Sequence, residues 1–427
     1  MGDLRVRVLL TTVGSRGDVQ PLLALAMRLR ATGHEVRMCV PPDFQDWIGG
    51  LGIPVTPIGP VMRQALASSP PASLPAEQLR LMAEAQVAAQ FDRIPPVADG
   101  CDVVVSTTPG LTAVHSVAEM LGIGYVFAVY SPNQLPSPHH APPPVPLLGR
   151  ELAPAGADHR ELWARDAENV NERFGPPLNR HRAAVGLPAL DDVRGHVFTD
   201  RPWLAADPTL GPWPEPADQQ VFQPGAWILP DERPLSPELE AFLDDGEPPI
   251  YFGFSSMVRM QDDLGPVLVE TARALGRRAV ISRGWADVAL PDDGSDCIAV
   301  GEVNLQALFR RVAAVVHPSS AGTTALVAMA GAPHVVVPQM YDQHYWAERV
   351  EQLGIGTPHL SDTVTAESLT SALDLALRPE VVARARSVAT AVRRDGVQLS
   401  AERLTSDVRT LTASGPVASP AGSPGRS

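Results

Sequence analysis

Residues 312–354 constrain the fold more strongly than any other stretch, because their pattern is that of two buried strands joined by a short helix. The apolar, β-branched run at 312–316 predicts the first strand, and the run at 334–337 predicts the second. Thr323 or Thr324 can cap the helix between them, and a glycine ends it. Two strands joined through a helix lie parallel in one sheet. The stretch therefore predicts an α/β fold whose ligand-binding loops follow the carboxyl ends of the strands.

Those loops carry groups suited to a ligand with phosphates and hydroxyls. His317 ends the first strand, and the N-terminus of the next helix offers N–H groups that suit a phosphate. Asp342 and Gln343 follow the second strand and can hydrogen-bond a polyhydroxylated group. The alternatives are structural: a satisfied buried histidine for His317, and an ordinary turn before a helix for the Asp-Gln pair. We interpret the two loops as a diphosphate site beside a sugar site.

Strands alternate with helices along most of the chain, which predicts two Rossmann-like, doubly wound parallel-sheet domains facing a cleft. A proline-dense stretch separates the two series of strands. We expect an N-terminal domain at 1–210, a linker at 211–225, a C-terminal domain at 226–411 and a disordered tail at 412–427. We also expect the last helix to pack back on the N-terminal domain.

Charge and composition argue against several classes of partner. The 48 acidic and 34 basic residues give a net charge of −14, which disfavours binding to nucleic acid or to an anionic membrane. No apolar run reaches about 18 residues, and the N-terminus lacks the pattern of a signal peptide. We therefore expect a cytoplasmic protein without stable membrane association. The 3 cysteines are expected to be buried free thiols.

The turn after the first predicted strand holds the sharpest candidate for chemistry. Asp18 stands beside the start of the first helix, so its carboxylate is expected at the cleft. It is either a helix cap or a general base that accepts a proton from a hydroxyl. The helix N-terminus is expected to lower the pKa of this carboxyl and keep it ionised near neutrality. Ser15 can hold the carboxylate in place.

Taken in order, these motifs resemble the actinobacterial antibiotic glycosyltransferases of family 1 with the GT-B fold, most closely those that decorate vancomycin-type glycopeptides. The likeness extends to about residue 411. It implies that the N-terminal domain binds the acceptor and that the C-terminal domain binds a dTDP- or UDP-linked sugar. The matching stretches are 14–43, 222–239, 282–287, 301–304 and 312–354.

The resemblance also implies roles for individual residues. Asp18 becomes the general base with Ser15 beside it, and the charge of the diphosphate is met by His317, Thr323 and the helix N-terminus in place of a metal. The lack of an Asp-X-Asp pair agrees with a site that needs no metal. The implied donor-binding residues are Arg16, Ser255, Ser256, Trp285, Glu302, Val303, His317, Ser319, Ser320, Ala321, Gly322, Thr323, Asp342 and Gln343. The implied acceptor-binding residues are Pro132, Asn133, His139 and His140.

Two loops depart from the family pattern of His-His-Gly-Gly-Ala-Gly-Thr-Thr and Gly-Phe-Gly-Ser. Pro318, Ser319 and Ser320 follow His317 in the first loop, and Ser255 replaces a glycine in the second. A serine where glycine takes a positive φ costs about 1 kcal/mol. We expect a retuned donor site in which serine hydroxyls replace lost backbone amides. The alternative is a weakened or inactive enzyme.

The sequence thus predicts inverting, metal-independent transfer of a sugar from a dTDP- or UDP-sugar to a hydroxyl of a glycopeptide antibiotic aglycone or pseudoaglycone. We expect a monomer or weak homodimer with no cofactor beyond the nucleotide sugar as co-substrate. Three alternatives stay open: a glycosyltransferase for a polyketide or macrolide, a nucleotide-sugar epimerase, and a non-catalytic partner protein of the same fold. The proline-rich loop at 131–149 argues against the epimerase, which needs no mouth for a bulky acceptor.

Overall fold

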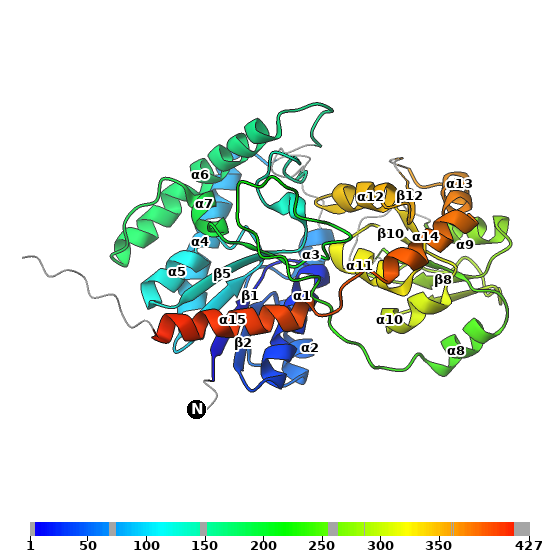
Figure 1. Ribbon diagram of the computed structural model, residues 1–427, viewed down its shortest axis with the longest axis horizontal. Helices are drawn as coiled ribbons and strands as arrows, with labels where there is room; N and C mark the ends of the chain where they lie inside the picture. Colours follow the sequence, from blue (N-terminus) through cyan, green and yellow to red (C-terminus); the bar gives the residue numbers. More distant parts are fainter. Residues whose placement is uncertain are drawn as a thin grey trace, which may run out of the picture.

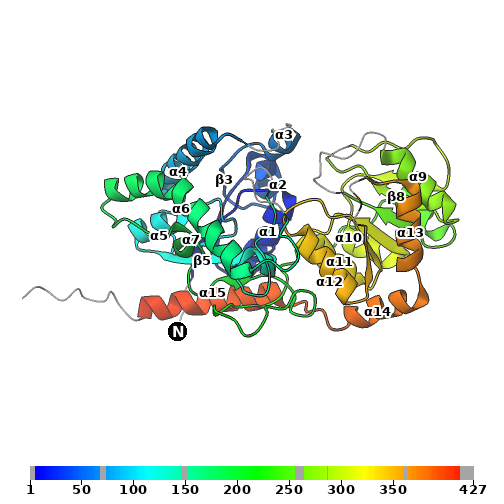
Figure 2. The same ribbon diagram turned by 90° about the horizontal axis from the view of Figure 1, so that it is seen from above.

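The chain folds into two α/β halves, each built on a six-stranded parallel sheet with helices on both faces (Figures 1 and 2). The computed structural model describes residues 5–67, 74–145, 152–254, 264–285, 287–359, 361 and 363–413. This architecture confirms the predicted pair of doubly wound domains. Apolar runs such as Val103–Ser106 are buried along their whole length, as expected for parallel strands covered on both faces.

The N-terminal sheet has the strand order β3-β2-β1-β4-β5-β6. Its strands are β1 (Arg7–Thr11), β2 (Glu35–Val40), β3 (Val55–Pro57), β4 (Val103–Ser106), β5 (Gly124–Val129) and β6 (Trp203–Leu204). Its helices are α1 (Arg16–Ala31), α2 (Gln45–Gly50), α3 (Met62–Ala67), α4 (Ala76–Ala98), α5 (Val114–Leu121), α6 (His159–Ala184) and α7 (Val193–Phe198). The strand order changes direction between β1 and β4, so the β1–α1 turn lies where such sheets bind ligands.

The C-terminal sheet repeats this plan in the order β12-β11-β10-β7-β8-β9. Its strands are β7 (Ile250–Phe252), β8 (Ala279–Ser282), β9 (Cys297–Val300), β10 (Ala314–His317), β11 (His334–Val336) and β12 (Gly356–Pro358). Its helices are α8 (Pro237–Asp244), α9 (Leu264–Ala274), α10 (Leu305–Leu308), α11 (Ala321–Ala330), α12 (Gln343–Gln352), α13 (Ala366–Ala376) and α14 (Pro379–Ala389). The switch between β7 and β10 puts the loop after β10 at the cleft.

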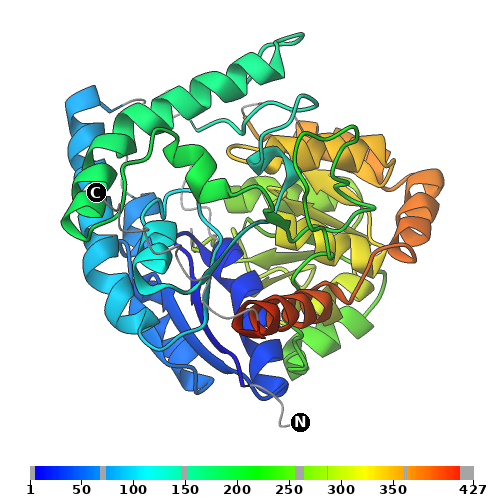
Figure 3. The same ribbon diagram turned by 60° about the vertical axis from the view of Figure 1, so that its left-hand side comes forward.

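The last helix, α15 (Gly396–Ala413), leaves the C-terminal domain and packs on the N-terminal one (Figure 3). Ala401, Leu404 and Val408 belong to the same buried cluster as the apolar face of α1. The Trp227 indole donates a hydrogen bond to the Ser400 hydroxyl (2.7 Å) inside this contact. The helix therefore completes the hydrophobic core of the domain that begins the chain.

The chain crosses between the domains twice, and the segments beside the two crossings touch. The predicted linker 211–225 lies against the N-terminal domain, and the first crossing falls between Leu229 and Leu235, which pack on different domains. The second crossing precedes α15. A Cβ placed on Gly396 would lie 2.5 Å from the carbonyl carbon of Gly225. Glycine is therefore required at 396 for the two segments to pass backbone to backbone.

Two smaller expectations have clear outcomes. The helix in the stretch 312–354 ends at Gly331 in a left-handed conformation, as predicted, but its cap is Ser320 rather than either threonine. Cys39, Cys101 and Cys297 are free and buried, which confirms the prediction made for them. Among the described residues, none of the helices has the length and apolar character needed to cross a membrane.

Candidate active site

Asp18 lies at the start of α1 in a capping box with Ser15. The Ser15 N–H donates to Oδ2 of Asp18 (2.8 Å), and the Ser15 hydroxyl donates to the same oxygen (3.4 Å). The Ser15 hydroxyl in turn accepts from the Gly17 N–H (3.3 Å). A Cβ at Gly14 would lie 2.2 Å from Oδ2 of Asp18, so only glycine leaves room for the carboxylate. The turn thus fixes the carboxylate at the carboxyl end of β1.

The pKa of Asp18 is raised to about 7, chiefly because the carboxyl is buried. The hydrogen bond from the Ser15 N–H opposes this rise, and the negative charge of Asp342 adds to it. The expected lowering of the pKa by the helix N-terminus is therefore wrong, since desolvation is the larger effect here. A carboxylate with a pKa near 7 is well matched to accept a proton near neutral pH.

Asp342 belongs to the other domain, yet it is close enough for its charge to raise the pKa of Asp18. It occupies the N-cap position of α12 with no capping hydrogen bond from its side chain, and its Oδ2 accepts a hydrogen bond from the Trp346 indole (2.9 Å). Burial raises the pKa of Asp342 to about 6. The Gln343 carbonyl oxygen accepts from the Gln339 N–H (2.8 Å), so its NH₂ group is the part that can donate to a sugar hydroxyl.

The His317 ring is engaged on both nitrogens inside the C-terminal domain. Its Nδ1 accepts from the Ser319 N–H (3.1 Å), so Nε2 carries the proton and donates to Nδ1 of His334 (3.1 Å). The ring is fully buried, and burial lowers its pKa to about 3. A neutral ring held in this way offers neither charge nor a donor to a phosphate. In this arrangement the His317 ring has a structural role, and a contact of this residue with the donor phosphates stays a prediction.

The serine loop after His317 separates into two parts. Ser319 takes the positive φ (73°) expected for one of the substituted glycines, and its buried hydroxyl pairs with that of Thr324 (3.1 Å). Ser320 takes an ordinary φ of −67° at the cap of α11, and its partly buried hydroxyl donates to that of Thr323 (3.1 Å). Only the second pair stands at the first turn of the helix, where an anion would bind.

The first turn of α11 faces the N-terminal domain across a narrow gap. A cavity of about 10 Å³ there is lined by Ala321 and Gly322 on one side and by Pro21 and Tyr130 on the other. This volume holds about one water molecule. The helix N-terminus therefore lies at the domain boundary, on the side of the β1–α1 turn. Ser255 and Ser256, also expected at the donor site, lie outside the described residues.

Residues expected to contact the nucleotide join the two domains directly. The Arg16 guanidinium forms an ion pair with Glu302 and lies over the Trp47 ring, 4.7 Å from its centroid. Trp285 packs against the core of the N-terminal domain, and Val303 packs in the C-terminal one. The implied contact of Trp285 with the donor remains a prediction.

The predicted acceptor residues differ in how much of them reaches the surface. Pro132 and Asn133 are buried in the short 3₁₀ turn η2 (Pro132–Gln134). His140 lies among the rings of Trp163, Trp213 and Tyr345, with centroids 5.9 to 6.5 Å away, and burial lowers its pKa to about 4. His139 is exposed, with Nε2 2.9 Å from the Pro216 carbonyl oxygen. Of the four, His139 is the one that can meet a ligand without rearrangement.

Two tyrosines near Asp18 were not singled out from the sequence. The Tyr130 hydroxyl donates to the backbone carbonyl of Asp18 (3.0 Å). Tyr341 precedes Asp342, takes a positive φ of 55° and donates its N–H to the Pro144 carbonyl (3.2 Å). Each contact joins segments far apart in the chain, so local pattern carries no signal for it. The sequence signal that could have drawn attention to Tyr341 is its position, as a bulky residue between the end of a strand and the Asp-Gln pair.

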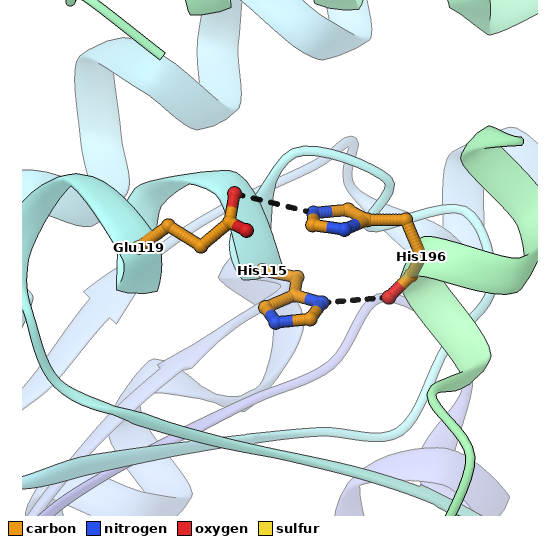
Figure 4. Close-up of side chains that lie close together, drawn as sticks. All are labelled: His115, Glu119 and His196. Atoms are coloured by element: carbon orange, nitrogen blue, oxygen red, sulfur yellow. Dashed lines mark hydrogen bonds and ion pairs between the residues drawn. The ribbon is translucent and has the colours of Figure 1, made fainter. Parts of the chain in front are cut away.

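Two clusters among the described residues have ligand atoms close enough for a metal ion. Figure 4 shows the first, with His115 and Glu119 on α5 beside His196 on α7. The two histidine rings stack nearly in parallel, with centroids 3.9 Å apart, and Arg182 forms an ion pair with Glu119. Stacked rings cannot aim both lone pairs at one ion, and the arginine already neutralises the carboxylate. This cluster is best explained as a structural network.

The second cluster holds Asp292, Asp296 and Cys297. Arg273 bridges both carboxylates, at 2.8 Å from Asp292 and 2.7 Å from Asp296. A cation would have to displace this guanidinium. Neither cluster includes a residue of the cleft described above, so neither can supply a metal to Asp18 or Asp342.

Comparison with known proteins gives matches over both halves of the chain. Residues 8–136 match the model described as "Glycosyltransferase family 28 N-terminal domain". Residues 287–400 match the model described as "Erythromycin biosynthesis protein CIII-like, C-terminal domain". The two matches fall on the N-terminal and C-terminal sheets respectively.

Full-length relatives come from Amycolatopsis orientalis. Glycosyltransferase GtfE is 53% identical over 93% of this chain and 97% of its own. The vancomycin aglycone glucosyltransferase is 49% identical over the same shares, and a dTDP-epi-vancosaminyltransferase is 46% identical over 90% and 93%.

Solved structures with the same fold are more distant in sequence. The glycotransferase of kitacinnamycin has a TM-score of 0.71 at 19% identity, covering 94% of this chain and 98% of its own. The calicheamicin glycosyltransferase CalG4 has a TM-score of 0.66 at 18% identity, covering 97% and 100%. These neighbours establish the GT-B fold.

Proposed function

Because the chain belongs to the glycosyltransferase family that contains the vancomycin aglycone glucosyltransferase, we propose that it glycosylates a hydroxyl of a glycopeptide antibiotic aglycone or pseudoaglycone. The donor in this proposal is a dTDP- or UDP-sugar. A dTDP-linked sugar is supported by the name of the dTDP-epi-vancosaminyltransferase, at 46% identity. The family 1 label remains a prediction, since the matching N-terminal model carries the family 28 description.

The observation that supports the mechanism is the Asp18 carboxyl. Its pKa is about 7, and it lies within range of the charge of Asp342 from the C-terminal domain. In the proposed step Asp18 takes the proton of the acceptor hydroxyl while the oxygen of that hydroxyl attacks the anomeric carbon of the donor sugar. The bond to the nucleotide diphosphate breaks on the opposite face, so the configuration inverts. The departing diphosphate carries the electron pair away, and the N–H groups and hydroxyls at the first turn of α11 stabilise its charge.

Ser15 holds the base in place through its two hydrogen bonds to Oδ2. Asp342 and Gln343 would contact the sugar hydroxyls from the C-terminal side of the cleft. No metal ion takes part in this proposal, because the helix N-terminus meets the diphosphate charge. The proposal also includes a cytoplasmic monomer or weak homodimer with no cofactor beyond the nucleotide sugar.

A macrolide or polyketide acceptor is the second candidate. It is favoured by the match of residues 287–400 to the erythromycin-type C-terminal model and by an O-mycaminosyltylonolide 6-deoxyallosyltransferase of Streptomyces fradiae at 31% identity. That identity is well below the 53% of GtfE. The glycopeptide acceptor is therefore the better supported of the two.

The direct test is to incubate the protein with vancomycin aglycone or a macrolide aglycone and a panel of dTDP- and UDP-sugars. A mass gain of one sugar on the glycopeptide supports the proposal, and the anomeric configuration of the product, read by NMR, tests inversion. Transfer to the macrolide alone would favour the second candidate. Absence of transfer to either aglycone, with intact folding, would refute the proposed activity.

A further inference from the structure

Tyr341 presents an aromatic ring at the junction of the two domains. It lies in the segment between β11 and α12, directly before Asp342, and 45% of its surface is exposed. Its two neighbours in the sequence have side chains turned into the protein, Asp342 toward Trp346 and Gln343 toward the backbone of Gln339. Tyr341 is therefore the aromatic side chain of this segment that stays accessible beside the cleft.

The backbone of Tyr341 is held in a conformation that tyrosine rarely adopts. Its φ of 55° lies in the left-handed region, which costs an L-residue about 1–2 kcal/mol. A glycine would adopt it without this cost. The N–H of Tyr341 donates to the Pro144 carbonyl of the proline-rich loop (3.2 Å). A contact from the N-terminal domain thus helps to keep the strained residue in place, as is often seen at functional sites.

The Tyr341 hydroxyl is near enough to the proposed base for the charge of Asp18 to act on it. Burial and then this charge raise the pKa of the hydroxyl, and the neutral phenol can donate a hydrogen bond. Tyr341 therefore adjoins Asp342, which is the predicted sugar contact, and the proline-rich loop expected to line the acceptor mouth, and its hydroxyl lies within range of the Asp18 charge. An acceptor whose hydroxyl reached Asp18 would pass beside this ring.

We propose that Tyr341 is an acceptor-binding residue contributed by the sugar-binding domain, with its ring packing against a rigid, aromatic acceptor as the hydroxyl reaches Asp18. This inference rests on the proposed function and adds a specificity-determining residue to it. Both domains would then contribute to acceptor binding. Tyr341 belongs to the C-terminal domain, and its backbone is held by Pro144 of the N-terminal domain. An aromatic face suits the stacked aromatic side chains of a glycopeptide better than an aliphatic macrolide.

The test uses full-length Tyr341→Ala, Tyr341→Phe and Tyr341→Gly variants with vancomycin aglycone as the acceptor probe. Tyr341→Ala is expected to raise the acceptor KM about tenfold and to leave the donor KM within about twofold, and Tyr341→Phe is expected to keep most of the acceptor affinity. Leu375→Ala is the matched control, because Leu375 is an exposed apolar residue of α13 in the same domain. It should change neither constant.

Tyr341→Gly separates the ring from the backbone. If the ring is what binds, the glycine variant shows the same rise in acceptor KM as the alanine variant. A glycine variant with wild-type acceptor KM, or a change confined to the donor KM, would overturn the inference. Calorimetric titration of the aglycone gives a second readout, with about tenfold weaker binding expected for Tyr341→Ala.

The titration also keeps this inference distinct from the proposed function. Wild-type protein that binds the aglycone but transfers no sugar would refute the proposed activity, and the affinity of Tyr341→Ala would still decide the role of the ring. Wild-type transfer with unchanged aglycone binding in Tyr341→Ala would refute the role of Tyr341 alone.

Discussion

Replacing Asp18 by asparagine should raise stability and abolish most activity in the same variant. The carboxylate serves as both a helix cap and the proposed base. An asparagine carbonyl can still accept the Ser15 N–H bond that the carboxylate now accepts at 2.8 Å. The start of α1 should therefore be retained, and the change removes mainly the ability to ionise.

The size and sign of the stability effect follow from the pKa of Asp18, raised from 3.8 to about 7. Between these two values the folded state binds more protons than the unfolded state, so the free energy of unfolding falls as pH rises across that window. The fall is complete above pH 7. The total loss in the free energy of unfolding is at most about 4 kcal/mol, because the pKa rises by about three units and each unit corresponds to about 1.4 kcal/mol. Asp18→Asn avoids this loss, so it should exceed the wild type in stability at pH 8, and much less so at pH 4.

The measurement is urea unfolding of both proteins at pH 4 and pH 8, paired with steady-state kinetics. We expect kcat of Asp18→Asn to fall by roughly 10²- to 10⁴-fold with little change in donor affinity. In the wild type, kcat/KM should rise with pH through an apparent pKa near 7, the value of Asp18. Asp158→Asn is a suitable control, since Asp158 is an exposed cap of α6 that accepts from the Arg160 N–H.

Two results would refute this reasoning. Near-normal turnover in Asp18→Asn would make the residue a cap and place the base elsewhere. An equal stability difference between the two proteins at pH 4 and pH 8 would show that the carboxyl is not desolvated in the folded protein.

The phosphate loop, the domain contact and the role of metals each give a further test. Ser320→Gly should weaken dTDP-sugar binding about tenfold and Ser319→Gly less than twofold, because only the Ser320 hydroxyl stands at the first turn of α11; equal effects in calorimetry would contradict this. Arg16→Gln and Glu302→Gln should each lower kcat/KM by roughly twofold to fivefold at low salt, with no further loss in the double variant and little difference at high salt. Additive losses of kcat/KM in the double variant would show that the two residues do not act through their ion pair. Turnover should survive EDTA, and a loss that Mg²⁺ restores would argue for a metal.

Most of the fold could be predicted because each strand is a local, apolar, β-branched run. The strands predicted at 312–316 and 334–337 lie within two residues of β10 (Ala314–His317) and β11 (His334–Val336). The loop with Ser319 was also predictable, since the glycine that it replaces implies a positive φ. These features depend on neighbours in the sequence, so a single sequence carries enough information to find them.

The electrostatic character of the site could not be predicted in this way. The pKa of Asp18 depends on burial at the domain boundary and on a carboxylate from the other domain. The His317 ring is satisfied by His334, which reaches it only when β10 and β11 pair. His140 was expected at an exposed mouth, yet three aromatic rings from separate segments surround it. Each of these outcomes is set by tertiary contacts that leave no mark on local pattern.

The path of α15 determines how this enzyme could be recombined with its relatives. A hybrid made by a single junction near Leu235 would carry the foreign partner's last helix, and that helix would have to fit the native α1. Such a hybrid would disrupt the core that holds Ala401, Leu404 and Val408. A second junction just before Gly396 would keep the native helix with its own core. The segment that can be exchanged between relatives is therefore the stretch from about Leu235 to the residue before Gly396. The protein that receives it keeps its own residues 396–413.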